Sequence, residues 1–111
     1  MKYYMHKKDA KEVLSGHGHG SFPLLTAEHG CTGGCCTGIS YYTALEYTPP
    51  AVHEDQEGFY VIKGRGVARI AGTEFSVEPD MSFIAPAGAV HQFKCDCGEA
   101  PLVLFWFHAQ A

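Results

Sequence analysis

The amino-acid sequence predicts one small all-β domain, built as a sandwich or a barrel. Three observations lead to this expectation. The chain has 111 residues, which suffice for a single hydrophobic core. Hydrophobic residues make up 46% of it and charged residues 18%, as in chains that fold. Thirteen glycines and six prolines disfavour long helices, and turn residues separate short apolar runs about every 8–12 positions.

The predicted strands lie mainly after Ile39. Apolar and polar residues alternate in 66–72 and 73–79, and glycine or proline closes most of the runs. The first run stops at Pro49-Pro50, because proline cannot donate to a strand ladder. The expected strands span 40–48, 58–64, 66–72, 73–79, 81–88, 91–97 and 102–109.

The first part of the chain has a different composition. Residues 1–38 are expected to form an irregular, glycine-rich arm that packs on a barrel made by residues 39–111, within one domain. The stretches GHGHG (16–20) and GCTGGCCTG (30–38) predict loops, because several adjacent glycines disfavour regular structure. Residues 22–27 suit a short strand.

Charge and hydropathy exclude several classes of partner. The net charge of −4 and the pI of about 5.9 do not indicate a basic surface that binds nucleic acid. No apolar run approaches the ~18–20 residues that span a bilayer, so no membrane segment is expected. The first 13 residues contain no apolar stretch typical of a secretory signal, so we expect a cytoplasmic protein.

Five cysteines and seven histidines are unusual for this length. The cysteines are Cys31, Cys35, Cys36, Cys95 and Cys97. In the cytosol thiols stay reduced, so free thiols or metal ligands are favoured over disulfides. The Cys-x3-Cys-Cys spacing matches no standard zinc or iron–sulfur motif. We therefore interpret Cys31, Cys35 and Cys36, with His17, His19 and His29, as loop residues near the mouth of the barrel.

One histidine–glutamate pair and one further histidine suit a metal site. His53 and Glu57 are four residues apart, which is ~13 Å in a straight strand and too far to share an ion. The polar residues 54–56 allow a bend that brings the two side chains together. His91 follows the turn residues 86–88 and begins another strand. Two imidazoles and one carboxylate suit Fe, Mn, Ni, Co, Cu or Zn and leave coordination positions open.

The stretches 50–66 and 78–93 resemble the two sequence motifs of the cupin superfamily. The first motif, G-x5-H-x-H-x3-E-x6-G, falls on Leu45, Ala51, His53, Glu57 and Gly64. The second motif, G-x5-P-x-G-x2-H-x3-N, falls on Asp80, Pro86, Gly88, His91 and Cys95. Three of five positions match in each, and the 15 residues between the motifs are typical of small single-domain cupins. The resemblance covers residues 39–107.

The resemblance implies a double-stranded β-helix, a jelly-roll-like barrel. It also implies a metal site, which most members build from three histidines and one glutamate. Here alanine replaces the first histidine, at Ala51. Water completes a three-ligand site of His53, Glu57 and His91, or another residue such as His29, His17 or a cysteine does so. The third alternative is that the metal has been lost and a polar pocket remains.

Further residues are predicted to line the pocket. On the strand expected over 40–48, Tyr41 and Tyr47 share one face. Phe59 and Phe93 are expected inside the barrel, with Phe83, Phe105 and Phe107 as additional filling. Cys95 shares the face of His91 and Phe93 and is expected to point inward, as a small buried residue.

The last predicted strand, LVLFWFHA (102–109), is apolar on both faces. Such a pattern is typical of a strand that is covered on both sides. If Phe105 and Phe107 fill the barrel, Trp106 faces outward, and His108, on the same alternation, is not a ligand. An outward tryptophan would then mark a buried surface, which predicts a twofold homodimer.

The sequence thus favours a cytosolic metal-binding cupin that acts on a small polar molecule of the sugar-acid or carboxylate type. The metal would be held by His53, Glu57 and His91. Whether the protein is an enzyme stays open, because one fold hosts many chemistries. The alternative is a non-catalytic module that binds or senses a small molecule through a degenerate metal site. A third class is a metal or redox store in the N-terminal arm.

Overall fold

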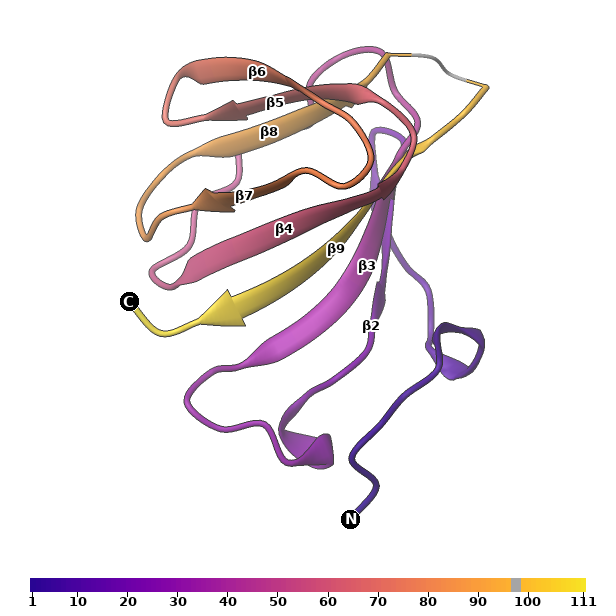
Figure 1. Ribbon diagram of the computed structural model, residues 1–111, viewed down its shortest axis with the longest axis vertical. Coiled ribbons are helices and arrows are strands. Elements are labelled where there is room, and N and C mark those ends of the chain that lie inside the picture. Colours follow the sequence, from indigo (N-terminus) through magenta and orange to yellow (C-terminus); the bar gives the residue numbers. More distant parts are fainter. Residues whose placement is uncertain (97–98) are drawn as a thin grey trace.

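The computed structural model describes residues 1–96 and 99–111 and consists of two antiparallel sheets (Figure 1). The strands are β1 (Val13–Gly16), β2 (His19–Pro23), β3 (Cys36–Tyr42), β4 (Gln56–Lys63), β5 (Gly66–Ile70), β6 (Thr73–Val77), β7 (Ser82–Ala85), β8 (His91–Cys95) and β9 (Leu102–Ala109). Two short 3-10 helices, η1 (Lys7–Asp9) and η2 (Ala27–His29), precede β1 and β3. The six-stranded sheet has the order β1-β2-β3-β9-β4-β7, and the three-stranded sheet has the order β6-β5-β8. The all-β prediction is confirmed.

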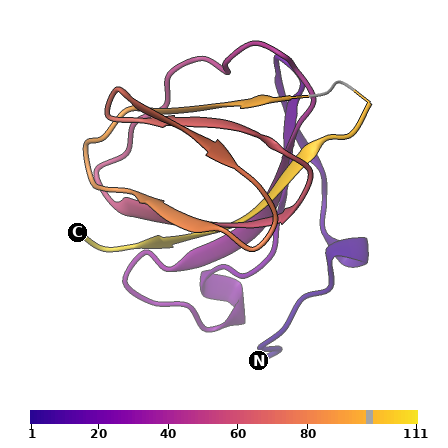
Figure 2. The same cartoon turned by 45° about the horizontal axis from the view of Figure 1, so that its top comes forward.

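The hydrophobic core lies between the two sheets, which face each other across the barrel (Figure 2). Leu102, Leu104, Val61 and Val77 are its largest fully buried side chains. Phe59, Phe83 and Phe93 pack ring against ring in its middle, with centroid distances of 5.1 to 5.9 Å. These three aromatic side chains fill the barrel as the sequence predicts. Cys97, expected on one strand face with Cys95, lies outside the described residues.

The N-terminal arm is more regular than the sequence predicts. The GHGHG stretch is the turn of a β1–β2 hairpin in which Gly16 pairs with His19. His17 and Gly18 have φ values of 52° and 71°. Two central residues with positive φ are typical of the type I′ turn, whose twist matches that of antiparallel strands. Glycine therefore serves the hairpin turn, and β2 then pairs with β3, which leaves β1 at the edge of the six-stranded sheet.

The strand predicted over 40–48 is displaced toward the N-terminus. β3 begins at Cys36 and ends at Tyr42, after which the chain leaves the six-stranded sheet. The following segment runs beside β8, where Ala44 accepts a backbone hydrogen bond from Cys95 and Thr48 donates one to Phe93. This crossing between the sheets hydrogen-bonds Ala44, Thr48 and Ala51 to β8 without a further strand in the first sheet.

The inward and outward faces of β9 are the reverse of the prediction. Leu102 and Leu104 are completely buried, and the period of two then places Trp106 and His108 on the same inner face. The indole Nε1–H of Trp106 donates a 2.8 Å hydrogen bond to Ser40 Oγ on β3, a partner that an inward indole needs. Phe107 points outward and is 40% exposed. The outward placement predicted for Trp106 and His108 is therefore wrong.

The described part of the chain has no helix that is both long and apolar enough to cross a membrane.

Candidate functional site

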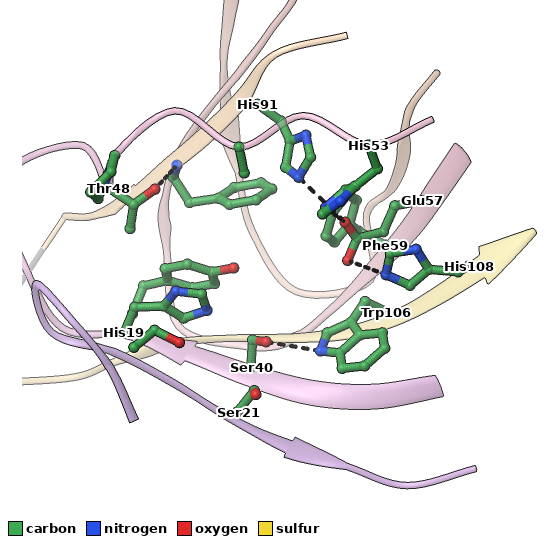
Figure 3. A pocket seen from close by; sticks show the side chains of 15 residues that line it. His19, Ser21, Ser40, Thr48, His53, Glu57, Phe59, His91, Trp106 and His108 are labelled. Carbon is green, nitrogen blue, oxygen red and sulfur yellow. Dashed lines mark hydrogen bonds and ion pairs between the residues drawn. The ribbon is translucent and has the colours of Figure 1, made fainter. Parts of the chain in front are cut away.

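A cavity of about 340 Å³ opens between the sheets and holds most of the polar side chains of the interior (Figure 3). One end contains histidines and a glutamate, and the other end contains hydroxyl groups and a further histidine. Its lining consists of Ser15, His19, Ser21, Ser40, Tyr42, Thr48, Pro49, Ala51, His53, Glu57, Phe59, His91, Phe93, Trp106 and His108.

Glu57 is the centre of the first end of the cavity. Its side chain is nearly buried, and three imidazoles approach it through their Nε2 atoms. His53 lies 3.4 Å and His91 3.3 Å from Oε1, whereas His108 lies 3.5 Å from Oε2. These four residues are called the Glu57 cluster below.

Strand pairing brings Glu57 and His108 together. β4 and β9 are antiparallel neighbours, and their register places Glu57 directly opposite His108. Side chains that are opposite each other on one face of such a pair have Cβ atoms about 4.5–5.5 Å apart. Residues 51 positions apart in the sequence thus meet because of register alone.

Turns and backbone bridges position the other two imidazoles. Ala51 and His91 exchange two backbone hydrogen bonds of 2.9 and 3.1 Å, which attach the segment before β4 to the start of β8. The carbonyl of His53 accepts a 2.8 Å hydrogen bond from the N–H of Gly88, in the turn that precedes β8. Gly88 has a φ of 78°, a conformation that glycine adopts readily. The two predicted motifs are therefore hydrogen-bonded to each other.

The second nitrogens of two rings already have partners. His91 Nδ1 lies 3.3 Å from the carbonyl oxygen of Ala89, and His108 Nδ1 lies 2.9 Å from Oδ2 of Asp55. Both partners accept hydrogen bonds, so both Nδ1 atoms carry the proton, and Nε2 of a neutral ring is then an acceptor. Each Nε2 nevertheless faces the carboxylate of Glu57, which also accepts. A cation bound between them would remove this repulsion between acceptors.

The protonation of His91 reflects this arrangement. Burial lowers its pKa, but the hydrogen bond to Glu57, the contact with the Ala89 carbonyl and the negative charge of Glu57 outweigh burial. The net effect raises the pKa of His91 above its ordinary value. The site therefore attracts positive charge at the position where the imidazoles meet Glu57.

The donor set fits a divalent transition metal. His53, Glu57 and His108 each offer an atom that lies within 4.8 Å of the other two, and His91 contacts the same carboxylate. Ligand atoms ~2.1 Å from an ion in a tetrahedral arrangement lie ~3.4 Å apart, close to the 3.3–3.5 Å observed between Glu57 and the imidazoles. Asp55 would act on the metal indirectly, because a carboxylate on Nδ1 orients a ligating histidine.

The structure brings together the three predicted ligands, His53, Glu57 and His91. Phe59 and Phe93, predicted in the substrate pocket, line the same cavity and form part of its apolar wall. His108 joins them from β9, although sequence reasoning placed it outside the site. That exclusion is wrong because the residues of β9 that were predicted to face outward face inward.

Three other predicted pocket residues do not line this cavity. The hydroxyl of Tyr41 donates to Glu12 on the outer side of β3, and this hydrogen bond raises the pKa of Tyr41. Tyr47 lies in the segment between the sheets, away from the Glu57 cluster. Cys95 is buried, but its thiol lies 3.1 Å from the carbonyl of Ala100, at the far end of β8. The displaced β3 explains the difference for the tyrosines, since Tyr42 takes the inward position.

Two of the candidates proposed to replace the missing histidine at Ala51, His29 and His17, lie elsewhere, whereas Cys36 lies beside the cluster. His29 Nδ1 accepts a 3.1 Å hydrogen bond from the backbone N–H of Thr26, as part of the cap of η2. His17 is exposed in the hairpin turn. Cys36 pairs with His108 across β3 and β9, and burial followed by the charge of Asp55 raises the pKa of its thiol. The imidazole that completes the Glu57 cluster is that of His108.

Sequence reasoning also missed Tyr42, Trp106 and His19 as lining residues. For Trp106 and His108 the signal is the pairing of β9 with β3 and β4, because residues 102–107 are all apolar and either alternation could be the buried one. For His19 and Tyr42 the signal is the pairing of β2 with β3, which places them opposite each other. Neither register can be read from one segment alone.

The comparisons with known proteins identify the family. The family model described as "Cupin domain" matches residues 42–108, more than half of the chain, so this protein belongs to the cupin family. No curated protein sequence shows significant similarity to the chain.

Solved structures share the fold at low sequence identity. The polyketide cyclase RemF from Streptomyces resistomycificus superposes with a TM-score of 0.80 at 20% identity, over 97% of this chain and 79% of that chain. KdgF from Halomonas sp. gives 0.78 at 15% identity, over 100% and 96%. Salicylate 1,2-dioxygenase from Pseudoaminobacter salicylatoxidans gives 0.73 at 16% identity, over 86% of this chain and 26% of that longer chain.

Proposed function

We propose that this cupin binds a divalent transition metal through His53, Glu57, His91 and His108 and acts on a small polar molecule. The observation that carries the proposal is the convergence of three Nε2 atoms on one nearly buried carboxylate. Two of those rings donate a hydrogen bond through Nδ1, so their Nε2 atoms are acceptors that face the accepting carboxylate of Glu57. A bound cation would remove the repulsion between these acceptors. Fe, Mn, Ni, Co, Cu and Zn all accept such a mixed nitrogen and oxygen set.

The substrate class follows from what a metal in this cavity would supply. A bound metal acts as a Lewis acid that polarises a carbonyl or carboxylate group. The chain itself contributes an apolar wall, with Phe59 and Phe93 beside the Glu57 cluster, which excludes water from one side of a ligand. A carboxylate or sugar acid suits this combination. Salicylate dioxygenase, whose structure with gentisate shares the fold, acts on an aromatic hydroxy acid, as its name states.

The alternative function is a non-catalytic binding or sensing module with a degenerate metal site. Alanine at Ala51 favoured that alternative at the level of the sequence. The position of His108 weakens it, because a third imidazole approaches Glu57 from the opposite strand.

The test is metal binding by an isosteric variant. Glu57→Gln keeps the shape of the side chain and removes its charge, so we expect Zn²⁺ affinity to fall by about 100-fold or more. Glu54→Gln is the matched control, since Glu54 is exposed three residues earlier. Elemental analysis of untagged protein and titration of the metal-free protein with Zn²⁺ give the readout. Equal Zn²⁺ affinity in the wild type and Glu57→Gln would refute the proposal.

The outer face of the six-stranded sheet supports the predicted homodimer. Tyr60, Ile62, Ile84 and Phe107 point outward and are 40–47% exposed, which forms an apolar surface on neighbouring strands. A second copy of the chain would cover it. Light scattering at micromolar concentration should give twice the mass of the monomer, and Ile84→Lys should give the monomer. A monomeric wild type would refute this assembly.

A further inference from the structure

The end of the cavity remote from Glu57 is built by the N-terminal hairpin. The register of β2 and β3 places His19 opposite Tyr42 and Ser21 opposite Ser40, and all four line the cavity. Figure 3 shows His19 across the open space from Glu57 and His91. Because the family match begins at residue 42, β2 lies outside the stretch that the family describes. The arm therefore supplies His19 and Ser21 to this end of the cavity, and β3 supplies Ser40 and Tyr42.

The imidazole of His19 is fixed by packing. It stacks on the ring of Tyr42 with a centroid distance of 4.5 Å and an interplanar angle of 15°. Tyr42 is itself 5% exposed and packs against Phe93 at 5.1 Å. Within residues 1–96 and 99–111, no group hydrogen-bonds to either ring nitrogen of His19. The ring is thus oriented, while both of its nitrogens remain available to a ligand.

The charge state of His19 defines what it can recognise. Burial lowers its pKa, and the charge of Glu57 opposes this only in part, so the ring is neutral at pH 7. A neutral imidazole has one donor and one acceptor. A hydroxyl group also donates and accepts, whereas an ionised carboxylate only accepts. His19 can therefore donate to a hydroxyl group or accept from one, whereas a carboxylate can interact only with its N–H.

We propose that His19 binds a hydroxyl group at the end of the substrate remote from Glu57, so that the substrate is a small hydroxy acid. This inference rests on the proposed function for the other end, where the Glu57 cluster would meet the acid group. The cavity volume of about 340 Å³ limits the ligand to a small molecule. His19 is thereby a determinant of specificity supplied by the N-terminal hairpin.

Two six-carbon acids test the inference. Gluconate carries hydroxyl groups along its chain, and hexanoate carries none. In calorimetric titrations of the Zn²⁺-loaded wild type, gluconate should bind more tightly than hexanoate. His19→Phe retains a ring that can stack on Tyr42 and removes both nitrogens, so the affinity for gluconate should fall by about 3- to 10-fold. The affinity for hexanoate should not fall. His19→Gln, which restores a donor and an acceptor, should recover most of the gluconate affinity.

Two further measurements separate this inference from the metal site. Zn²⁺ affinity should be the same in wild type, His19→Phe and His19→Gln, and a loss in either variant would overturn the assignment of His19 to substrate. In the wild type, the ring nitrogen signals of His19 in NMR spectra should shift with gluconate and not with hexanoate. This measurement needs no variant to fold.

Failure has two distinguishable forms. Equal gluconate affinity in wild type and His19→Phe, or no preference of the wild type for gluconate, would overturn the role of His19. A wild type that takes up no Zn²⁺ would instead refute the proposed function. The gluconate and hexanoate titrations would then be made on the metal-free protein, where the effect of His19→Phe decides as before.

Discussion

The imidazoles around Glu57 come from two kinds of segment. His53 and His91 lie in or beside turns that are hydrogen-bonded to each other, with Gly88 at a φ of 78°. His108 lies on β9, paired with β3 on one side and β4 on the other. The first two are marked by nearby proline, glycine and polar residues, whereas the third is preceded by six apolar residues.

The difference shows where site information is local and where it is not. A turn carries its own residue preferences, so a histidine after Pro86-Ala87-Gly88 can be placed from its neighbours. A strand with apolar residues at every position does not show which of its faces is buried, because either face can be the buried one. The phase of β9 is set by its partners, since Ser40 on β3 accepts the indole hydrogen of Trp106. Register therefore decides that His108 faces Glu57.

Among the variants that bear on this comparison, the one with the largest expected effect tests the strand side. His108→Ala removes the imidazole opposite Glu57 and should raise the Zn²⁺ dissociation constant by about 10- to 100-fold or more. His29→Ala is the matched control, because His29 was the competing candidate and caps η2 instead. It should leave Zn²⁺ affinity unchanged. If His29→Ala loses metal and His108→Ala does not, the sequence-based alternative is right and the Glu57 cluster is wrongly composed.

Much of the fold was nevertheless predictable. The runs at 58–64, 66–72 and 73–79 correspond to β4, β5 and β6, because each alternates or ends at glycine or proline. The predicted ligands in the two motifs lie together because turns and backbone bridges bring the motifs together. The type I′ turn at His17-Gly18 was not recognised, since a glycine-rich pentapeptide suits either a loop or a hairpin. For the same reason, the sequence did not predict that His19 forms one end of the cavity.

The second prediction sharpens the contrast between the inner and outer faces of β9. Gly38 lies opposite Trp106, and a Cβ there would come within 2.2 Å of the indole. Gly58 lies opposite Phe107, and a Cβ there would come within 2.3 Å of the phenyl tip. The indole is held by Ser40, whereas the exposed phenyl ring can swing aside. Gly38→Ala should therefore lower the free energy of unfolding by about 1–3 kcal/mol.

Gly58→Ala should change that free energy by less than about 1 kcal/mol, since the added methyl also reduces the entropy of the unfolded chain. Urea denaturation of both variants at the same low protein concentration gives the comparison. A larger loss for Gly58→Ala would mean that Phe107, and not Trp106, is the constrained ring. That result would favour the phase that sequence reasoning proposed for β9.

The smallest expected effect concerns Ala51, where the family motif has a histidine. Ala51 lines the cavity and is bridged to His91 by two backbone hydrogen bonds, so Ala51→His would point an imidazole toward Glu57. Because His108 already supplies the third imidazole, the substitution should tighten Zn²⁺, Mn²⁺ and Ni²⁺ binding by less than about tenfold. In the double variant Ala51→His/His108→Ala, the new imidazole should restore Zn²⁺ affinity to within about tenfold of the wild type. If Ala51→His alone increased the Zn²⁺ affinity by about 100-fold or more, a coordination position would be vacant in the wild type. If the double variant does not recover Zn²⁺ affinity, an imidazole at position 51 and the imidazole on β9 do not bind the same ion.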